Sequence, residues 1–285
     1  MEKIDLENWV LFSDRSNSKN YHSKDMKWLL KTSSDKVQFK LEDLLDEKET
    51  AATALSFGLP TPMVKDVAIL RDGKYGRIYE YIKDKKSIAR AISEDIDNID
   101  FYMEKFVKLE DKIHSIKSDG IKYKSIEERI KEGLEGFDIY TDEEKKILYR
   151  YMDTIEKKDT FLHVDCQTGN VITSSKGEYA IDIGLLSYGN PIYDSAIYYL
   201  FSKMYVDEVK ADKFFHVNVA NSFKCWDAYV KYQYGITDDK KKKKLEEKLA
   251  PVAILTFTAH LPQIPCFEVH REVQKKFFKK YFVNV

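Results

Sequence analysis

A polar strand-and-turn segment, residues 160–182, interrupts a long helical region and constrains the fold of this chain more than any other feature. The runs "TFLHVD", "NVITS" and "EYAIDI" have the composition of short strands joined by tight turns. The first turn, "HVDCQTGN" (163–170), carries a histidine, an aspartate and an asparagine, and "AIDIG" (180–184) and "GNPIYD" (189–194) follow it. We therefore expect polar side chains to gather on a few short strands within a helical region.

The first eighty residues predict a small sheet with one helix packed on it. "MKWLLK" (26–31) and "YGRIYEYI" (75–82) have the aromatic and aliphatic content of strands, and the Asp-Gly after "VAIL" is typical of a tight hairpin. The intervening helix ends at Gly58. Its apolar face is predicted to consist of Leu41, Leu44, Leu45, Ala52 and Leu55.

From about residue 87 the apolar residues recur with helical period, as in the amphipathic run 98–116. Ser125 with Glu128 and Thr141 with Glu144 are predicted capping boxes. The lysine-rich run 238–250 is flanked by acidic residues and indicates a solvated helix start. We expect an α+β fold with two lobes, residues 1–82 and residues 83–285.

Composition narrows the class of protein without pointing to a partner. The 285 residues include 47 basic and 48 acidic side chains, a balance that argues against a nucleic-acid binder. Three separated cysteines suggest neither disulfides nor a zinc site, and neither a signal peptide nor a membrane-spanning run is recognisable. We expect a cytoplasmic monomer or homodimer that binds neither nucleic acid nor membrane.

An aspartate and an asparagine five positions apart in one turn suit phosphoryl transfer. One carboxylate there must orient or accept the proton of an attacking hydroxyl, while a second oxygen ligand holds Mg²⁺ near the phosphates. Asp165 and Asn170 match the spacing of the kinase catalytic loop, in which an arginine takes the place of Val164. Asp182, followed by Gly184, matches the next metal-binding carboxylate.

Together, "HVDCQTGNV", "IDIG" and "GNPIYDSA" resemble the motifs of the aminoglycoside phosphotransferase and choline kinase superfamily. "GLPTP" (58–62), followed by "YGRIYEYI", is similar to bacterial members of this superfamily. The resemblance runs from about residue 25 to residue 200. It implies a two-lobed, protein-kinase-like fold with ATP in the cleft, a small antiparallel N-terminal sheet and a mainly helical C-terminal lobe.

The resemblance also implies roles for residues of the second lobe and the metal site. Asp165 becomes the catalytic base or hydroxyl-positioning residue, with Asn170 and Asp182 as Mg²⁺ ligands. His163 is expected to brace this loop rather than to react. Asp194 is expected to be a buried buttress, and the turn before it is attributed to Gly189 and Pro191.

In the first lobe, the resemblance calls for a strand lysine that contacts the phosphates and is held by a helix glutamate. Lys31 ends an apolar strand run and fits the lysine, while either Glu47 or Glu49 fits the glutamate, with Glu47 preferred. Backbone groups of Glu80 and Ile82 are expected to meet the adenine. The nucleotide is expected to be ATP or GTP.

Two departures from the family pattern bear on activity. The expected phosphate-covering loop, "SDRSNSKNYH" (13–22), has no glycine. Val164 stands where the family has glycine, so either its backbone is ordinary or the loop is displaced. His114 is expected to be a packed core residue, and the other histidines, His260 among them, carry no metal-ligand spacing.

The sequence favours an ATP- and Mg²⁺-dependent kinase that phosphorylates a hydroxyl of a small molecule, such as an aminoglycoside, choline or a sugar. The alternative is a nucleotide-binding pseudokinase or regulatory module without turnover, which the glycine-free loop would favour. A protein kinase is a lesser alternative, because the residues between Asp182 and Asp194 leave no room for a long activation loop.

Overall fold

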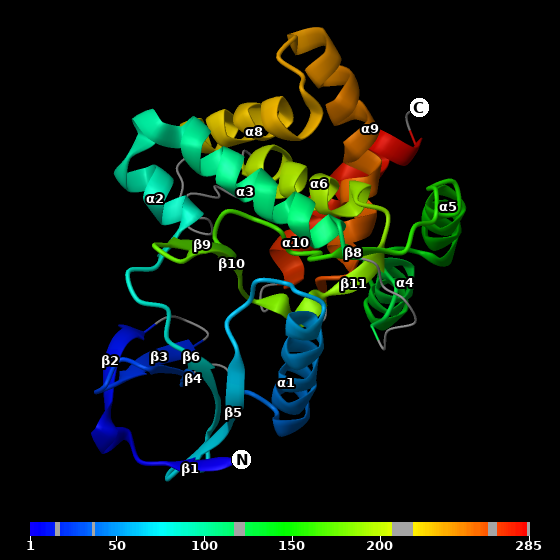
Figure 1. Ribbon diagram of the computed structural model, residues 1–285. Coiled ribbons are helices and arrows are strands. Elements are labelled where there is room, and N and C mark those ends of the chain that lie inside the picture. Colours follow the sequence, from blue (N-terminus) through cyan, green and yellow to red (C-terminus); the bar gives the residue numbers. More distant parts are fainter. Residues whose placement is uncertain (15–17, 36–37, 117–122, 207–218, 262–266, 284–285) are drawn as a thin grey trace. The chain divides into compact units, whose positions relative to one another are not determined.

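The computed structural model describes residues 1–14, 18–35, 38–116, 123–206, 219–261 and 267–283 (Figure 1). The chain forms two compact units. The first unit consists of residues 1–86 together with 172–184, and the second of residues 87–171 together with 185–285.

The sequence assigned the hairpin 172–184 to the C-terminal lobe, whereas the contacts of the structure group it with the first unit. Two hydrogen bonds tie it to the first unit: the Ala180 N–H donates to the Pro60 carbonyl over 2.8 Å, and the Ser175 N–H donates to the Asp84 carboxylate over 3.0 Å. Contacts so distant in sequence are not visible in a local pattern, so the sequence placed the hairpin with its chain neighbours.

The first unit contains a six-stranded sheet in the order β1-β5-β6-β4-β3-β2. β1 runs parallel to β5, and the other neighbouring strands are antiparallel. The predicted strands correspond to β4 and β6, and the predicted hairpin turn is confirmed, with Gly73 at a φ of +84°. The strands are β1 (Glu2–Ile4), β2 (Trp9–Asp14), β3 (Ser18–Ser23), β4 (Trp28–Ser33), β5 (Val64–Leu70) and β6 (Tyr75–Glu80).

The region 13–22, interpreted from the sequence as a phosphate-covering loop, is mostly strand. β2 continues to Asp14 and β3 begins at Ser18, so Ser18, Asn20 and Ser23 of β3 take part in an antiparallel ladder. Residues 15–17, at the centre of the expected loop, lie outside the described residues.

Helix α1 (Leu41–Ser56) confirms the predicted helix, but its buried face is rotated from the predicted one. Leu44, Ala51 and Ala54 are buried, whereas Leu45 is 48% exposed. Small alanines fill the face because α1 packs closely on β5. Leu30, Ala68 and Ile78, on β4, β5 and β6, form a buried cluster.

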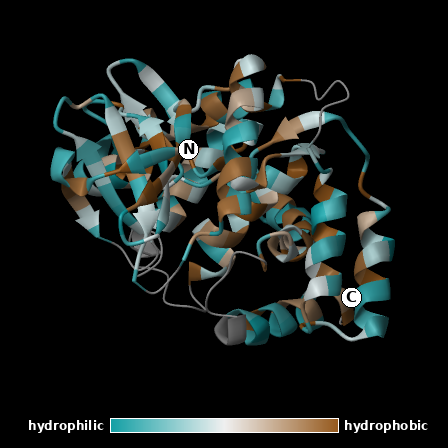
Figure 2. Ribbon diagram, turned by 90° about the horizontal axis from the view of Figure 1, so that it is seen from below, coloured by the Kyte–Doolittle hydropathy of each residue, from teal (hydrophilic) through white to brown (hydrophobic). Residues whose placement is uncertain are grey.

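The second unit is mainly helical. Several of its helices bury one apolar face, whereas residues 193–199 and 252–258 are buried on all sides. Figure 2 shows the alternation of hydrophobic and hydrophilic stretches along the helices. α6 packs on α9, α3 on α8, and α4 on α9. The main helices are α2 (Ile88–Glu94), α3 (Ile99–His114), α4 (Ile126–Gly136), α5 (Asp142–Met152), α6 (Ile192–Tyr199), α8 (Val219–Tyr234), α9 (Asp239–Thr258) and α10 (Phe267–Phe278).

Short strands occur where the sequence predicted them. β8 (Thr160–Leu162) pairs with β11 (Ser187–Gly189) in the second unit. β9 (Val171–Ser174) lies between β10 (Gly177–Ala180) and β7 (Lys86–Ser87) in a three-stranded sheet. The remaining described elements are η1 (Leu6–Asn8), η2 (Ile96–Asn98), η3 (Ile183–Leu185), η4 (Leu200–Met204) and η7 (Lys279–Val283).

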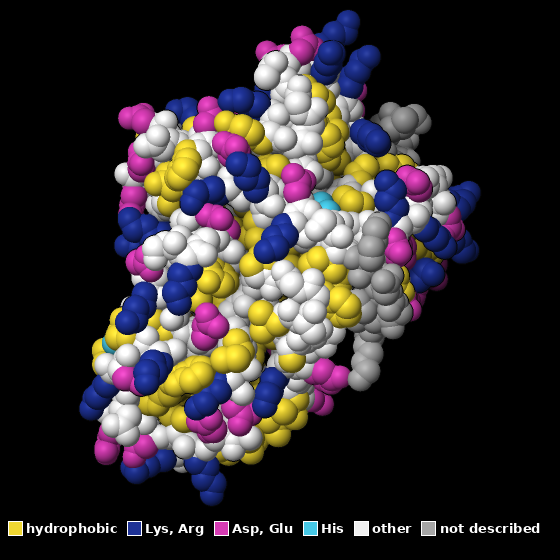
Figure 3. Space-filling view, in the orientation of Figure 1, with side chains coloured by type: hydrophobic (Ala, Val, Ile, Leu, Met, Phe, Trp, Pro, Cys, Tyr) yellow, Lys and Arg dark blue, Asp and Glu magenta, His cyan; other side chains and the backbone are white. Residues whose placement is uncertain are grey.

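Helix capping and surface charge follow the predictions. Both capping boxes are present at the starts of α4 and α5, and the lysine-rich run begins α9 behind an Asp238 cap. On the face shown in Figure 3, basic and acidic side chains are interspersed, in line with the near-zero net charge. Within the described residues, no helix combines the length and apolar character needed to cross a membrane.

Replacing Gly133 with alanine is expected to lower the free energy of unfolding by about 1–3 kcal/mol, the usual cost of overpacking. A Cβ at Gly133 would lie 1.9 Å from the Thr258 carbonyl oxygen, so α4 and α9 would have to separate. Gly136→Ala, in the same helix with nothing within 4 Å of its Cβ, is the matched control. Urea unfolding of both variants tests this, and equal stabilities would contradict the close approach.

Candidate active site

In the first unit, β4 and the β10 hairpin bring Lys31 and Asp182 together. The Lys31 Nζ is 2.7 Å from the Asp182 Oδ1. Asp182 lies two residues after the end of β10 and has a φ of +56°, a left-handed conformation that turns the chain sharply. Its side chain is 48% exposed, so the carboxylate is held by a lysine yet remains accessible to solvent.

Glu47 takes different partners from those the family pattern suggested. Its carboxylate forms an ion pair with Arg77 on β6 and accepts a hydrogen bond from the Tyr79 hydroxyl over 2.7 Å. The structure therefore pairs Lys31 with Asp182, in place of the expected pair with Glu47. Burial raises the pKa of Tyr79 to about 12, so its hydroxyl stays a donor at neutral pH. A role for Glu47 toward a nucleotide stays a prediction.

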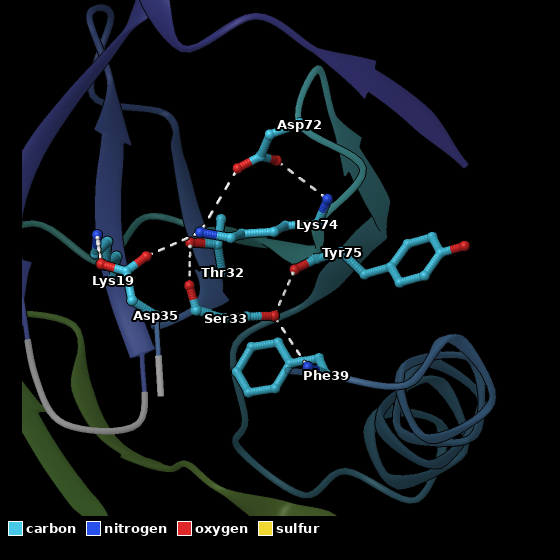
Figure 4. Close-up of polar contacts among 8 residues, drawn as sticks. All are labelled: Lys19, Thr32, Ser33, Asp35, Phe39, Asp72, Lys74 and Tyr75. Atoms are coloured by element: carbon cyan, nitrogen blue, oxygen red, sulfur yellow. Dashed lines mark hydrogen bonds and ion pairs between the residues drawn. The ribbon is translucent and has the colours of Figure 1, made fainter. Parts of the chain in front are cut away.

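Polar contacts fasten the end of β4 just after Lys31 (Figure 4). The Ser33 hydroxyl donates to the Tyr75 carbonyl over 3.4 Å and accepts from the Phe39 N–H over 2.9 Å. Asp35 bridges Lys19 and Lys74, each over 2.9 Å, and these lysines lower its pKa to about 2. The strand that carries Lys31 is thus anchored at its end to β3 and β6.

Backbone groups at the end of β6 and just after it, expected to meet the adenine, already form some hydrogen bonds within the first unit. The Glu80 N–H donates to the Met63 carbonyl, which leaves the Glu80 carbonyl rather than its N–H as the candidate nucleobase contact. Tyr81 lies beside Phe12, with ring centroids 6.5 Å apart, and Lys85 lies 5.1 Å from the Tyr81 ring. Burial lowers the pKa of Lys85 to about 8. The role of Ile82 stays a prediction.

In the second unit, the turn after β8 holds Asp165 in a network of amides. The Asn170 Nδ2 donates to the Asp165 Oδ2 over 2.6 Å and to its backbone carbonyl over 3.0 Å. The Gln167 Nε2 donates to the Asp165 Oδ1 over 3.2 Å. The Asp165 side chain is 22% exposed, so a partly buried carboxylate faces solvent from a turn that fixes its orientation.

Asp194 supports this turn by accepting hydrogen bonds from its backbone. It is fully buried at the start of α6, and its two carboxylate oxygens accept the backbone N–H groups of His163 over 2.9 Å and Val164 over 2.6 Å. Val164 has a φ of +68°, so its backbone is left-handed. Of the two alternatives for the valine, an ordinary backbone is therefore wrong: the chain keeps the glycine-like conformation, and Asp194 holds it in place.

Behind Asp194 lies a buried polar chain. The His114 Nε2 is 2.9 Å from the Asp194 Oδ2, and the Glu110 carboxylate accepts from the Tyr229 hydroxyl over 2.8 Å. Potential ligand atoms of Glu110, His114 and Asp194 all lie within 4.8 Å of one another. Burial lowers the pKa of His114, but the Asp194 and Glu110 carboxylates outweigh this effect and raise it. His114 is thus a core residue, as predicted, with the added function of binding Asp194.

Burial also raises the pKa of Glu110 to about 7, against 4.5 in an exposed carboxyl. Between these values the folded protein holds a proton that the unfolded chain releases, so the free energy of unfolding falls as pH rises from about 4.5 to 7. The raised pKa of His114 acts in the same direction. We expect Glu110→Gln to remove on the order of 3 kcal/mol of this decline. Urea unfolding across this pH range measures it, and an unchanged slope would contradict the assignment.

Gly189 and Pro191 were attributed to the turn before Asp194, and the structure gives Gly189 another reason. Gly189 ends strand β11, where a Cβ would lie 2.5 Å from the Ile126 Cγ2. Close packing, rather than turn formation, therefore requires glycine there. Pro191 is the N-cap residue of α6 with a φ of −53°, which suits a helix start.

The structure adds one residue that the sequence did not single out. The His260 Nε2 lies 3.6 Å from the Asp165 Oδ1, although 95 positions separate the two (260 − 165). Nearby, a hollow of about 20 Å³ has room for roughly one water molecule. The hollow is lined by Gln167, Thr168, Tyr198, Phe201, Ser202, Ser222 and Cys225.

Comparison with solved structures shows which proteins share this fold. A thermostable mutant of aminoglycoside phosphotransferase APH(4)-Ia, in complex with ADP and hygromycin B, superposes with a TM-score of 0.65 at 10% identity over 97% of this chain and 95% of that chain. The fold is that of the aminoglycoside phosphotransferases. Plasmodium vivax ethanolamine kinase matches with a TM-score of 0.56 at 12% identity, over 96% of this chain and 80% of that chain.

A third aminoglycoside phosphotransferase-fold neighbour, APH(3'')-Id from Streptomyces rimosus, matches with a TM-score of 0.51 at 14% identity, over 86% of this chain and 93% of that chain. No protein-family model matches the sequence, and no curated protein matches it either. The two-lobed kinase-like fold expected from the motifs is therefore confirmed by structure, at identities that leave the chemistry to be argued from this chain's own residues.

Proposed function

We propose that this protein transfers the γ-phosphate of ATP or GTP to a hydroxyl group of a small molecule. The single observation that carries this proposal is the state of Asp165: a partly exposed carboxylate, fixed by Asn170 and Gln167, on a turn whose left-handed Val164 is held by buried Asp194. Such a carboxylate is suited to accept the hydrogen of an attacking hydroxyl.

In this proposal each residue has a task that its own contacts support. Asp165 orients the acceptor O–H and receives its proton as the oxygen attacks the γ-phosphorus and the bond to the nucleoside diphosphate breaks. Lys31 contributes a positive charge for the phosphates, and His163, whose backbone is bound by Asp194, braces the loop. The Glu80 carbonyl and the Ile82 N–H would bind the nucleobase.

Mg²⁺ is the metal that fits the available donors. The Asp182 carboxylate is half-exposed, and the Asn170 amide turns its nitrogen toward Asp165, which directs its oxygen elsewhere. Both residues offer the hard oxygen ligands that Mg²⁺ prefers. When bound, Mg²⁺ would neutralise phosphate charge and hold the phosphates for transfer.

Nucleotide-dependent stabilisation tests the nucleotide and metal parts of the proposal. With ATP or GTP at a hundred times its Kd and Mg²⁺ present, we expect the free energy of unfolding to rise by about 2.7 kcal/mol. Asp182→Asn should lose the metal-dependent part of this rise, whereas Asp72→Asn, in the β5–β6 turn, should retain it. Thermal unfolding with and without Mg²⁺ measures this, and no rise with either nucleotide would refute nucleotide binding at this site.

The second candidate is a nucleotide-binding pseudokinase or regulatory module. The glycine-free turn between β2 and β3 favours it, because backbone N–H groups approach phosphates most closely where no Cβ intervenes. A protein that shows the nucleotide-dependent rise but transfers no phosphate would match this candidate.

A further inference from the structure

His260 follows α9 closely, and its side chain is 8% exposed. Its Nδ1 lies 3.2 Å from the Thr256 carbonyl oxygen, and a carbonyl can only accept, so Nδ1 carries a proton. Its Nε2 is buried, has no hydrogen-bond partner among the described residues, and faces the Asp165 Oδ1 at 3.6 Å. One nitrogen is thus assigned, and the other points at the carboxylate proposed to act in catalysis.

The charge of Asp165 bears on whether Nε2 of His260 carries a proton. A neutral His260 with its proton on Nδ1 would turn a lone pair toward a carboxylate, which places two acceptors face to face in a largely buried site. A proton on Nε2 instead converts the contact into a charge pair and gives both ring nitrogens a partner. The rings of Phe201, centred 5.9 Å away, and Phe257, centred 6.3 Å away, pack against the imidazole. They restrict its rotation away from Asp165.

We propose that His260 is a positioning residue for Asp165, and that its protonated Nε2 holds the Oδ1 of the catalytic carboxylate. A carboxylate has about four lone-pair positions. The hydrogen bonds from Gln167 and Asn170 use two of them, and His260, whose Nε2 is 3.6 Å from Oδ1, lies beside a third. The position that remains is directed at the acceptor hydroxyl, so the carboxylate meets the substrate in one orientation.

This inference rests on the proposed function, because it assigns His260 a task in orienting the base. It goes further by adding a residue from outside the sequence motifs to the site. The alternative is that His260 only packs against aromatic rings. His270 offers a matched comparison, since its ring also packs on Phe257, at 5.5 Å, from helix α10.

Kinetics of three variants separate positioning from packing. We expect His260→Phe, which keeps an aromatic ring but has no N–H donor, to lower kcat for phosphate transfer about 10–100-fold with the nucleotide KM unchanged. His260→Gln, whose amide can donate to Asp165, should recover part of that loss. His270→Phe should keep the wild-type kcat. Equal kcat values for His260→Phe and His260→Gln would overturn the proposal.

A second readout requires no turnover. Long-range ¹H–¹⁵N NMR of the imidazoles, without nucleotide or acceptor, should show a proton on Nε2 of His260 in the wild type and its loss in Asp165→Asn. Retention of the Nε2 proton in the variant would overturn the pairing, whatever the activity. Loss of that proton in a protein that phosphorylates no alcohol would support the pair while refuting the proposed function, so the two failures are distinguishable.

Discussion

Asp165→Asn is expected to lower kcat for phosphate transfer by about 10²–10⁴-fold, the range typical for loss of a general base. Asparagine keeps the size of the side chain, but its amide cannot take the proton of the attacking hydroxyl. The Asn170 hydrogen bond to the Asp165 backbone carbonyl can persist, so the turn should keep its shape. Nucleotide affinity should therefore change little. Steady-state kinetics with an identified acceptor measures the loss.

The control for this variant is Asp153→Asn, at the exposed end of α5, which should keep the wild-type kcat. If Asp165→Asn retained more than about a tenth of the wild-type kcat, the assignment of the base would be contradicted. A rise in KM without a fall in kcat would also contradict it, since it would indicate a binding rather than a catalytic role.

Asp194→Ala is expected to lower the free energy of unfolding by about 3–5 kcal/mol, the cost of removing one partner of a buried charge pair. The change strands the buried N–H groups of His163 and Val164 and leaves His114 without its carboxylate. It also releases the left-handed Val164 backbone that Asp194 holds. Urea unfolding should show this loss, and circular dichroism should show whether the second unit remains helical.

Two further variants sharpen the Asp194 prediction. Asp194→Asn keeps one acceptor oxygen and should cost less than the alanine variant, because one of the two N–H groups retains a partner. Asp111→Ala, exposed on the same helix as His114, should change stability by less than about 0.5 kcal/mol. A loss below about 1 kcal/mol for Asp194→Ala would show that the turn does not depend on its buried buttress.

The motifs of this chain predict the fold well because they combine local patterns with a fixed spacing. The β5–β6 hairpin, α1 and both capping boxes are set by residues close in sequence, and each is present in the structure. β2 and β3 escaped prediction, and in β3 the polar run Ser18, Lys19 and Asn20 does not alternate with apolar residues. Pairing with neighbouring strands, rather than local propensity, makes them strands.

The site was only partly predictable for a related reason. The amides around Asp165 lie within its own turn, so the spacing of "HVDCQTGN" predicts that they are close to it. The partners of Glu47 could not be predicted, because Arg77 and Tyr79 reach it through the sheet. His260 lies far along the chain with no motif around it, and only the packing of α9 brings it to Asp165.

Detection of a phosphorylated product tests the central claim most directly. Wild-type protein would be incubated with Mg²⁺, ATP or GTP and separate acceptor pools of aminoglycosides, amino alcohols and sugars, and followed by ³¹P NMR. The account predicts a new phosphate monoester signal from one pool, in equal amount to the nucleoside diphosphate formed, and its loss in Asp165→Asn. Nucleotide binding without any monoester from any pool would contradict phosphotransfer to these small-molecule alcohols and favour the pseudokinase.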